Sequence, residues 1–173
     1  MATITRTWAM PSRWTFTIKP IAELLARLIP PGGDGWIDPF AGEHSPAATT
    51  NDLNPDRPTD HHLQAVEFLR LFPDRSVPGV LFDPPYSPRQ VKEVYAQIGL
   101  PLSQVDTQSK FWSQCKDEIQ RIAQPGATVI SFGWNSSGMG KRRGFELVEL
   151  LLVPHGWMHN DTIVTVERKT SLF

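Results

Sequence analysis

The sequence of 173 residues predicts an α/β fold, with a mostly parallel sheet, helices on both faces and an antiparallel hairpin at the carboxyl end. Short apolar runs alternate with stretches of helical periodicity, which is typical of parallel sheets. The central run Gly79-Val80-Leu81-Phe82 is apolar throughout, as strands buried on both faces are. The last two apolar runs are joined by residues 154–161 alone, a link that favours antiparallel pairing.

The first half of the chain predicts a leader, a helix and three short strands. Residues 1–18 are polar without clear periodicity, so we expect a leader that packs on the domain. Apolar residues recur at helical spacing over 19–29, and Pro20 suits a first helical turn. Residues 30–33, Pro-Pro-Gly-Gly, end this helix. The strands expected next are 36–40, 47–51 and a short one within 61–72 that runs into a helix.

The second half begins with the central strand, which Pro84 and Pro85 end because neither can donate to a ladder. Ser87 suits the N-cap of a helix that Gly99 closes, and a polar linker, 100–110, follows. The elements expected after it are an amphipathic helix over 111–123 and strands over 127–132, 145–153 and 162–167. The final pair would place a reversed strand at one edge of the sheet.

Composition limits the classes of function. Hydrophobic residues make up 40% and charged residues 20%, as in a soluble globular protein, and the length predicts a single domain, 1–173. The one cysteine, Cys115, excludes an internal disulfide and fits a reducing cytoplasm. No run predicts a membrane span or a signal peptide. The formal charge of −1 lacks the basic excess of dedicated nucleic-acid binders, which counts against tight autonomous binding to a duplex.

Chemically useful residues follow the central strand directly. Asp83 would lie at the carboxyl edge of the sheet, where open α/β folds bind ligands. The turn Pro84-Pro85 leaves backbone carbonyls without competing N–H groups, and Tyr86 presents an aromatic face. A carboxylate, a carbonyl and a stacking ring together suit an exocyclic amine on a planar heterocycle.

Two further acids follow the first two strands. Asp38 ends the first strand, and Gly42 in the next turn would let a cofactor approach the backbone. Asp52 ends the second strand, where an acid can accept hydrogen bonds from ribose hydroxyls. The loop 38–42 is not a full G-x-G-x-x-G, so its weight comes from the combination with Asp52 and Asp83.

In this combination the sequence resembles the S-adenosylmethionine-dependent amino methyltransferases, particularly DNA adenine-N6 methyltransferases and small members from phages and prophages. That family carries an F-x-G loop, an acid after strand two and a D/N/S-P-P-Y/F/W tetrapeptide after strand four. Here these are 40–42, Asp52 and 83–86, and residues 15–20 match the family's amino-terminal preamble. The resemblance implies a Rossmann-like class I methyltransferase fold with S-adenosyl-L-methionine as cofactor.

The resemblance also implies roles for individual residues. Asp83 and the carbonyl of Pro84 would accept hydrogen bonds from the N6 amine of adenine in DNA, and Tyr86 would stack on the flipped base. Pro85 completes the catalytic tetrapeptide. The implied cofactor pocket comprises Phe16, Lys19, Asp38, Pro39, Phe40, Gly42, Asp52, Leu53 and, toward the cofactor adenine, Gln64. No metal is implied, because the cofactor already activates the methyl group.

Most sequence-specific members carry a separate target-recognition domain, and none fits within this length. Loops 100–110, 133–144 and 154–161 would take its place, or a homodimer partner or separate subunit would supply it. The side chains expected to contact the substrate are Trp134, Asn135, Lys141, Arg142, Arg143, His155 and Asn160. Two alternatives stay open: the same transfer to RNA or to a free or modified nucleotide, and a non-catalytic subunit. The expected setting is the cytoplasm of a bacterial host or phage-infected cell.

Overall fold

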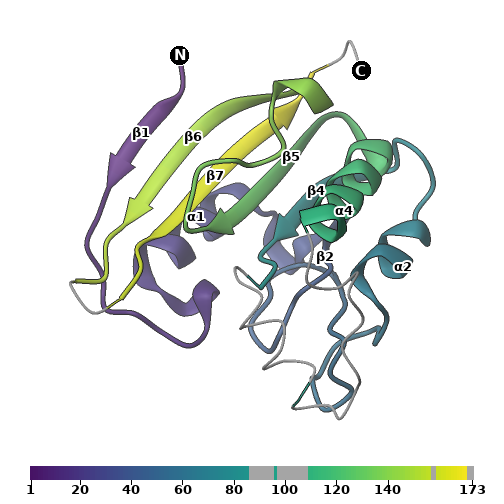
Figure 1. The fold of residues 1–173 in the computed structure, drawn as a ribbon, viewed down its shortest axis with the longest axis horizontal. Helices are drawn as coiled ribbons and strands as arrows, with labels where there is room; N and C mark the ends of the chain where they lie inside the picture. Colours follow the sequence, from purple (N-terminus) through teal and green to yellow (C-terminus); the bar gives the residue numbers. More distant parts are fainter. Residues whose placement is uncertain (86–95, 97–108, 157–158, 171–173) are drawn as a thin grey trace.

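A computed structural model of the protein describes residues 1–85, 96, 109–156 and 159–170 (Figure 1). Within them a seven-stranded sheet has the order β1-β6-β7-β5-β4-β2-β3. The elements are β1 (Thr3–Arg6), η1 (Thr15–Thr17), α1 (Lys19–Leu28), η2 (Pro31–Gly33), β2 (Trp36–Asp38), β3 (Thr49–Thr50), α2 (Ala65–Arg70), β4 (Val77–Phe82), α4 (Ser109–Ile122), β5 (Ala123–Gly133), η3 (Lys141–Arg143), β6 (Phe145–Val153) and β7 (Thr162–Lys169).

The sheet is mostly parallel, and β7 runs antiparallel to both of its neighbours. The predicted hairpin of β6 and β7 is therefore confirmed. The expectation that the reversed strand lies at an edge was wrong, because β7 sits between β5 and β6. Burial explains this order: most of β7 is buried, whereas β6 is exposed at 146–148 and half-buried at 149–150 and suits a place nearer the edge.

The leader also differs from expectation. Thr3–Arg6 forms β1, which pairs in parallel with residues 149–152 of β6 at one edge of the sheet. Its β-branched residues favour an extended backbone. Its four residues are all exposed, so the sequence there carries no hydrophobic alternation that would have indicated a strand.

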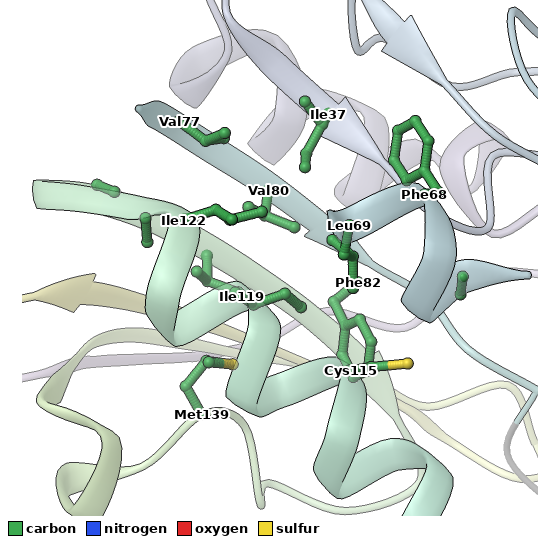
Figure 2. Packing of buried hydrophobic residues seen from close by; sticks show 14 of the residues in the cluster. Ile37, Phe68, Leu69, Val77, Val80, Phe82, Cys115, Ile119, Ile122 and Met139 are labelled. Atoms are coloured by element: carbon green, nitrogen blue, oxygen red, sulfur yellow. The ribbon is translucent and has the colours of Figure 1, made fainter. Parts of the chain in front are cut away.

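Helices cover both faces of the sheet, as the sequence predicted. Successive residues of β4 point to opposite faces, so Leu81 packs in a cluster with α1, whereas Val80 and Phe82 pack in another with α2 and α4. Figure 2 shows the second cluster, where Ile119 of α4 and Leu69 of α2 lie against the strands. The two clusters hold β4 rigidly, and with it the residue that follows its last position.

Other boundaries shift by a few residues. The second strand is only β3, and the expected third strand is reduced to a single parallel bridge between Asn51 and His61. β5 begins at Ala123, directly after α4, so strand pairing starts earlier than the sequence indicated. The helix expected over 87–99 and the linker up to residue 108 lie outside the described residues.

We expect Gly79→Ala to destabilise the fold. Gly79 of β4 pairs with Trp36 of β2, and an added Cβ would lie 2.2 Å from the Trp36 ring. Overpacking of this kind costs about 1–3 kcal/mol, so the urea midpoint should fall clearly. Gly133→Ala is the control, because its Cβ would meet only backbone atoms at 3.7 Å or more. Equal midpoints for the two variants would show that Trp36 moves aside freely.

Candidate active site

Three carboxylates converge at the carboxyl edge of the sheet. Asp38 is the last residue of β2, Asp52 follows β3 closely, and Asp83 follows β4. Because β2 is parallel to both β3 and β4, these strand ends meet at one edge. The negative charges of Asp83 and Asp52 both raise the pKa of Asp38, so the three groups lie within electrostatic reach of one another.

Asp38 is fully buried at the centre of this cluster. Its Oδ2 accepts a hydrogen bond from the Ser45 hydroxyl (2.6 Å), and its Oδ1 accepts one from the Phe40 N–H (2.9 Å). Burial is the largest influence and raises the pKa of Asp38 to about 7, against the lowering effect of these two bonds. The carboxyl group is thus poised between its neutral and charged forms, and a nearby cation would favour the charged form.

Asp52 holds the loop that follows β2. Its Oδ2 accepts a hydrogen bond from the Gly42 N–H (3.1 Å), and its Oδ1 accepts one from the Asn54 N–H (2.8 Å). Gly42 has a φ of +59°, a backbone conformation that residues other than glycine rarely adopt. The acid and the glycine picked out in the sequence are therefore joined directly, and the acid is oriented before any ligand binds.

Asn51 shapes the candidate site, and the sequence did not indicate it. It is buried, and its amide nitrogen donates to the carbonyls of Pro39 (3.1 Å) and Leu63 (3.0 Å). Its Oδ1 accepts from the Leu63 N–H (2.9 Å). Asn51 therefore straps the loop after β2 to the segment before α2, where Gln64 lies half-buried and has partners within the protein. The only feature of the sequence that could have pointed to Asn51 is its position next to the predicted Asp52.

Trp14 is a second residue that the sequence analysis missed. A Cβ on Gly42 would lie 3.4 Å from the Trp14 ring, so this ring covers the loop. The guanidinium carbons of Arg13 and Arg57 lie 4.6 and 5.0 Å from the ring centroid, and His44 meets the ring edge-on at 5.4 Å. The leader thus contributes a wall to the site, a contact that only the tertiary structure creates.

Aromatic pairs flank the end of β4 on both faces of the sheet. Phe40 meets Phe82 edge-to-face at 5.8 Å on the side of α2 and α4. Phe16 packs on Phe132 at 5.1 Å on the side of α1. Lys19 is exposed at the first turn of α1, and Pro39 is buried and Leu53 half-buried in the loops after β2 and β3.

The structure describes three of the four residues of the expected catalytic tetrapeptide, 83–86. Asp83, Pro84 and Pro85 are half-buried directly after β4, and Asp83 makes interactions within the protein. Tyr86 lies outside the described residues. The strand Val77–Phe82 ends where the sequence predicted, immediately before the acid.

The basic turn Lys141–Arg143 lies at the opposite edge of the sheet from the acids. The turn ends at Gly144, whose carbonyl accepts from the Thr170 N–H (2.8 Å) just beyond β7, and β6 then begins with Phe145 level with Lys169. The buried Glu167 carboxylate holds the preceding loop by accepting from the Gly140 N–H (2.8 Å). Arg143 is also occupied internally, by Asp117 at 2.8 Å and Ser113 at 3.0 Å. The expected position beside the acids was therefore wrong, because the loop crosses the whole length of the sheet.

The described parts of the link between β6 and β7, 154–156 and 159–161, do lie at the same edge as the acids, but His155 is buried. Its Nδ1 bonds the Ala9 carbonyl oxygen (2.9 Å), and its Nε2 bonds the Thr162 hydroxyl (2.8 Å). Both ring nitrogens are thus engaged in joining the leader to the hairpin, rather than turned to a ligand as expected. Asn160 in the same link is exposed.

Trp134 and Asn135 follow β5 at the same edge. Trp134 is 42% exposed and makes contacts within the protein. The side-chain oxygen of Asn135 accepts from the N–H (3.0 Å) and the hydroxyl of Ser137, so it shapes the loop turn. Of these two residues, Trp134 is the one that offers surface to a ligand.

Two other features bear on the chemistry. Cys115 is fully buried, and burial raises the pKa of its thiol to about 12, which does not suit a nucleophile. Within the described part of the chain, His, Cys, Asp and Glu side chains form no group of three suited to a metal ion. No helix described there is both long and apolar enough to cross a bilayer.

Solved structures share this architecture. TrmN from Thermus thermophilus aligns over 88% of this chain and 49% of its own, with 18% identity and a TM-score of 0.57. The chain therefore spans about half the length of TrmN. The 1,6-didemethyltoxoflavin-N1-methyltransferase of Burkholderia thailandensis, crystallised with S-adenosylhomocysteine, aligns over 87% of this chain and 76% of its own (14% identity, TM-score 0.57).

A third neighbour matches in length as well. The Escherichia coli protein yhhF, described as a candidate methyltransferase, aligns over 94% of this chain and 92% of its own, with 12% identity and a TM-score of 0.55. Our chain of 173 residues therefore has the Rossmann-like methyltransferase fold. No protein-family model and no curated protein sequence matches the chain. At these identities the likeness concerns the fold, so the activity must be argued from the site.

Proposed function

We propose that this protein transfers a methyl group from S-adenosylmethionine to an exocyclic amine, and that the amine is N6 of adenine in DNA. The observation that carries the proposal is the convergence of Asp38, Asp52 and Asp83 at the ligand-binding edge of a methyltransferase fold. The neighbour crystallised with S-adenosylhomocysteine supports the choice of cofactor. The Asp-Pro-Pro-Tyr sequence supports the choice of an amine as acceptor.

The polar and charged groups of the site fit this cofactor, which carries a sulfonium and an ammonium group, ribose hydroxyls and a carboxylate. Asp52, already oriented by the Gly42 and Asn54 N–H groups, offers its remaining lone pairs to the ribose hydroxyls. Asp38 supplies a negative charge that a bound cation would stabilise. Lys19, exposed at the first turn of α1, is the group that would meet the carboxylate.

The acceptor site follows from the end of β4. The bound cofactor supplies a methyl group that is already activated, so the protein's task is to position the amine. The Asp83 carboxylate and the Pro84 carbonyl would accept the two amine N–H bonds. These acceptors favour a pyramidal nitrogen with a freer lone pair, and they stabilise the positive charge that develops on it.

The position of the basic turn favours a second candidate substrate. Lys141 and Arg142 are exposed at the edge opposite the acids, and the site edge carries three carboxylates that repel phosphates. This distribution favours a substrate with few phosphates near the amine, such as a nucleotide or a flipped base far from its flanking backbone. This distribution therefore favours the same transfer to a free or modified nucleotide as the alternative, and it does not distinguish RNA from DNA, whose backbones carry the same charge.

Transfer of labelled methyl from S-adenosylmethionine tests both proposals. The acceptors are unmethylated duplex DNA, single-stranded DNA, total RNA and free nucleosides, followed by digestion and mass analysis. N6-methyladenine in DNA is the expected product. Label confined to RNA or to the free nucleosides would keep the chemistry and replace the substrate. Saturable cofactor binding with no transfer to any acceptor would contradict catalysis and indicate a binding subunit.

We expect Trp14→Ala to raise the dissociation constant for S-adenosylmethionine about tenfold and to change the maximal transfer rate less than twofold. Loss of the ring removes packing on Gly42 and the contact with the Arg57 guanidinium, but it leaves Asp83 untouched. Isothermal titration calorimetry gives the affinity, and Leu71→Ala, at an exposed apolar residue in a different part of the chain, is the control. A variant with unchanged affinity would show that the leader does not shape the cofactor pocket.

A further inference from the structure

The exposed apolar side chains of this protein are concentrated along one edge of the sheet. Eight large hydrophobic residues are exposed among those described, and six of them lie on the leader or at the adjoining start of β6. These six are Met1, Ile4, Trp8, Met10, Leu147 and Val148. Exposed apolar residues clustered in this way mark an interaction surface.

The leader extends the pairing of β1 beyond Arg6. The N–H groups of Thr7 and Ala9 donate to the carbonyls of Leu152 (3.0 Å) and Pro154 (3.2 Å). Backbone groups of a strand point alternately to its two sides, so the odd-numbered residues bond to β6. The even-numbered residues Ile4, Arg6 and Trp8 therefore direct their N–H and C=O groups outward, at the edge of the sheet.

The same even-numbered side chains also share a face. Thr5 pairs with Leu151, which packs in the cluster with α1, so odd-numbered side chains of the leader point to the α1 side. Ile4, Trp8 and Met10 consequently point to the other side, where α4 covers β4 and β5 but no described α-helix lies over β1 and β6 (Figure 1). One edge thus combines free backbone groups with a line of exposed apolar side chains.

We propose that this edge binds a second copy of the chain, through antiparallel pairing of β1 with the partner's β1 about a two-fold axis perpendicular to the sheet. Free backbone groups in a row are satisfied by another extended strand and not by a helix or a bilayer. A two-fold axis perpendicular to the sheet leaves the α4 faces of the two subunits' sheets on the same side of the dimer. It therefore brings the exposed apolar side chains of the two subunits next to one another.

The alternation of backbone groups selects the register. A two-fold axis at Thr5 pairs Ile4 with Arg6 of the partner subunit. In this register every outward N–H and C=O group of residues 2–8 can form a hydrogen bond across the interface. An axis at Arg6 would place two guanidinium groups opposite each other, which is unfavourable. An axis at Ile4 would leave Trp8 beyond the paired segment. The axis therefore lies at Thr5, at a pair without hydrogen bonds, where the two Cα atoms come to about 4.5 Å.

Disulfide trapping tests this register. Cys115, the only cysteine, is fully buried, so Thr5→Cys creates a single accessible thiol. Its separation from the partner's thiol would suit a disulfide, and mild oxidation should yield a covalent dimer. Ser136→Cys, in an exposed loop away from this edge, is the control and should form no covalent dimer. Failure of Thr5→Cys to cross-link beyond the control would overturn the proposal.

A charge pair separates specific pairing from simple apolar contact. In the proposed register residue 4 faces the partner's Arg6, so Ile4→Lys should raise the dimer dissociation constant at least tenfold. Ile4→Glu is equally polar but should bind more tightly than Ile4→Lys, most clearly at low salt. Sedimentation equilibrium should give twice the chain mass of 19.5 kDa for the native protein. Equal effects of Lys and Glu would contradict the register.

Two further outcomes would overturn the proposal outright. One is a native protein that stays at the chain mass up to about 100 μM, a concentration well above the dissociation constants of stable dimers. The other is a monomer that co-sediments with vesicles of phosphatidylglycerol and phosphatidylcholine and loses this binding in Ile4→Lys, which would assign the apolar strip to a lipid surface.

Discussion

Replacing Asp83 by alanine is expected to reduce methyl transfer about 1,000-fold while leaving the affinity for S-adenosylmethionine within a few-fold of the native value. Asp83 follows β4 at the point where the amine would bind, and alanine removes the acceptor that stabilises charge developing on the nitrogen. The structure adds a reason for a small change in cofactor affinity: loss of the Asp83 charge lowers the pKa of Asp38 slightly. Transfer of labelled methyl and calorimetric titration measure the two quantities separately.

Two variants control this experiment. Asp83→Asn retains an acceptor oxygen, and the resembled family accepts Asn at this position, so it should retain far more activity than Asp83→Ala. Asp34→Ala removes an exposed acid before β2, at the opposite edge of the sheet, and should behave like the native protein. A large loss of cofactor affinity in Asp83→Ala would place Asp83 in the cofactor pocket and contradict its assignment to the amine.

Replacing Asp38 by asparagine is expected to stabilise the cofactor-free protein above pH 7 and to weaken cofactor binding at least tenfold at pH 8. Burial raises the pKa of Asp38 to about 7, so the folded state holds this proton more tightly than the unfolded state. The resulting stability is complete below the ordinary carboxyl pKa near 4 and is lost as the pH rises toward 7. A shift of about three pKa units corresponds to roughly 4 kcal/mol.

Asparagine cannot ionise, so this dependence on pH should disappear in the variant. Its carbonyl oxygen can still accept from the Phe40 N–H, and the Ser45 hydroxyl can turn to accept from the amide. Urea midpoints at pH 5 and pH 8, for both proteins without cofactor, isolate the contribution of Asp38. Identical changes with pH in the two proteins would show that Asp38 does not titrate in this range.

Cofactor binding should show the complementary behaviour. A cationic cofactor favours the ionised form of Asp38, so the affinity of the native protein should rise between pH 6 and pH 8 and binding at pH 6 should release a proton. Titrations in two buffers of different ionisation enthalpy measure that proton. In Asp38→Asn both the rise and the release should vanish. A native affinity that does not change with pH would separate Asp38 from the cofactor.

The central part of this fold could be predicted from local sequence, because its signals are local. A continuous apolar run and the Pro84-Pro85 stop define β4 and place Asp83 after it, and the parallel arrangement then brings Asp38 and Asp52 to the same edge. β1 could not be predicted in this way, since an exposed polar strand has no hydrophobic pattern, and its pairing with β6 joins residues far apart in the chain.

The surroundings of the acids depended on long-range contacts. Trp14 reaches the loop at Gly42 only because the leader turns back over the sheet, and Asn51 straps that loop to Leu63 through its amide. Conversely, the sequence led us to expect the basic run at the substrate because it follows β5, whereas the pairing of Gly144 with Thr170 and of Phe145 with Lys169 places it at the far edge. Loop positions depend on such distant partners, which spacing in the sequence does not reveal.

The sequence by itself determined the α/β class, the strand that ends at Asp83 and the three acids, because strand periodicity and proline stops act between neighbouring residues. The tertiary structure alone decided that β7 lies inside the sheet, that His155 is buried between Ala9 and Thr162, and that an apolar edge lies along β1. These features arise from the burial of surfaces contributed by distant segments, and such burial is settled only when the whole chain packs.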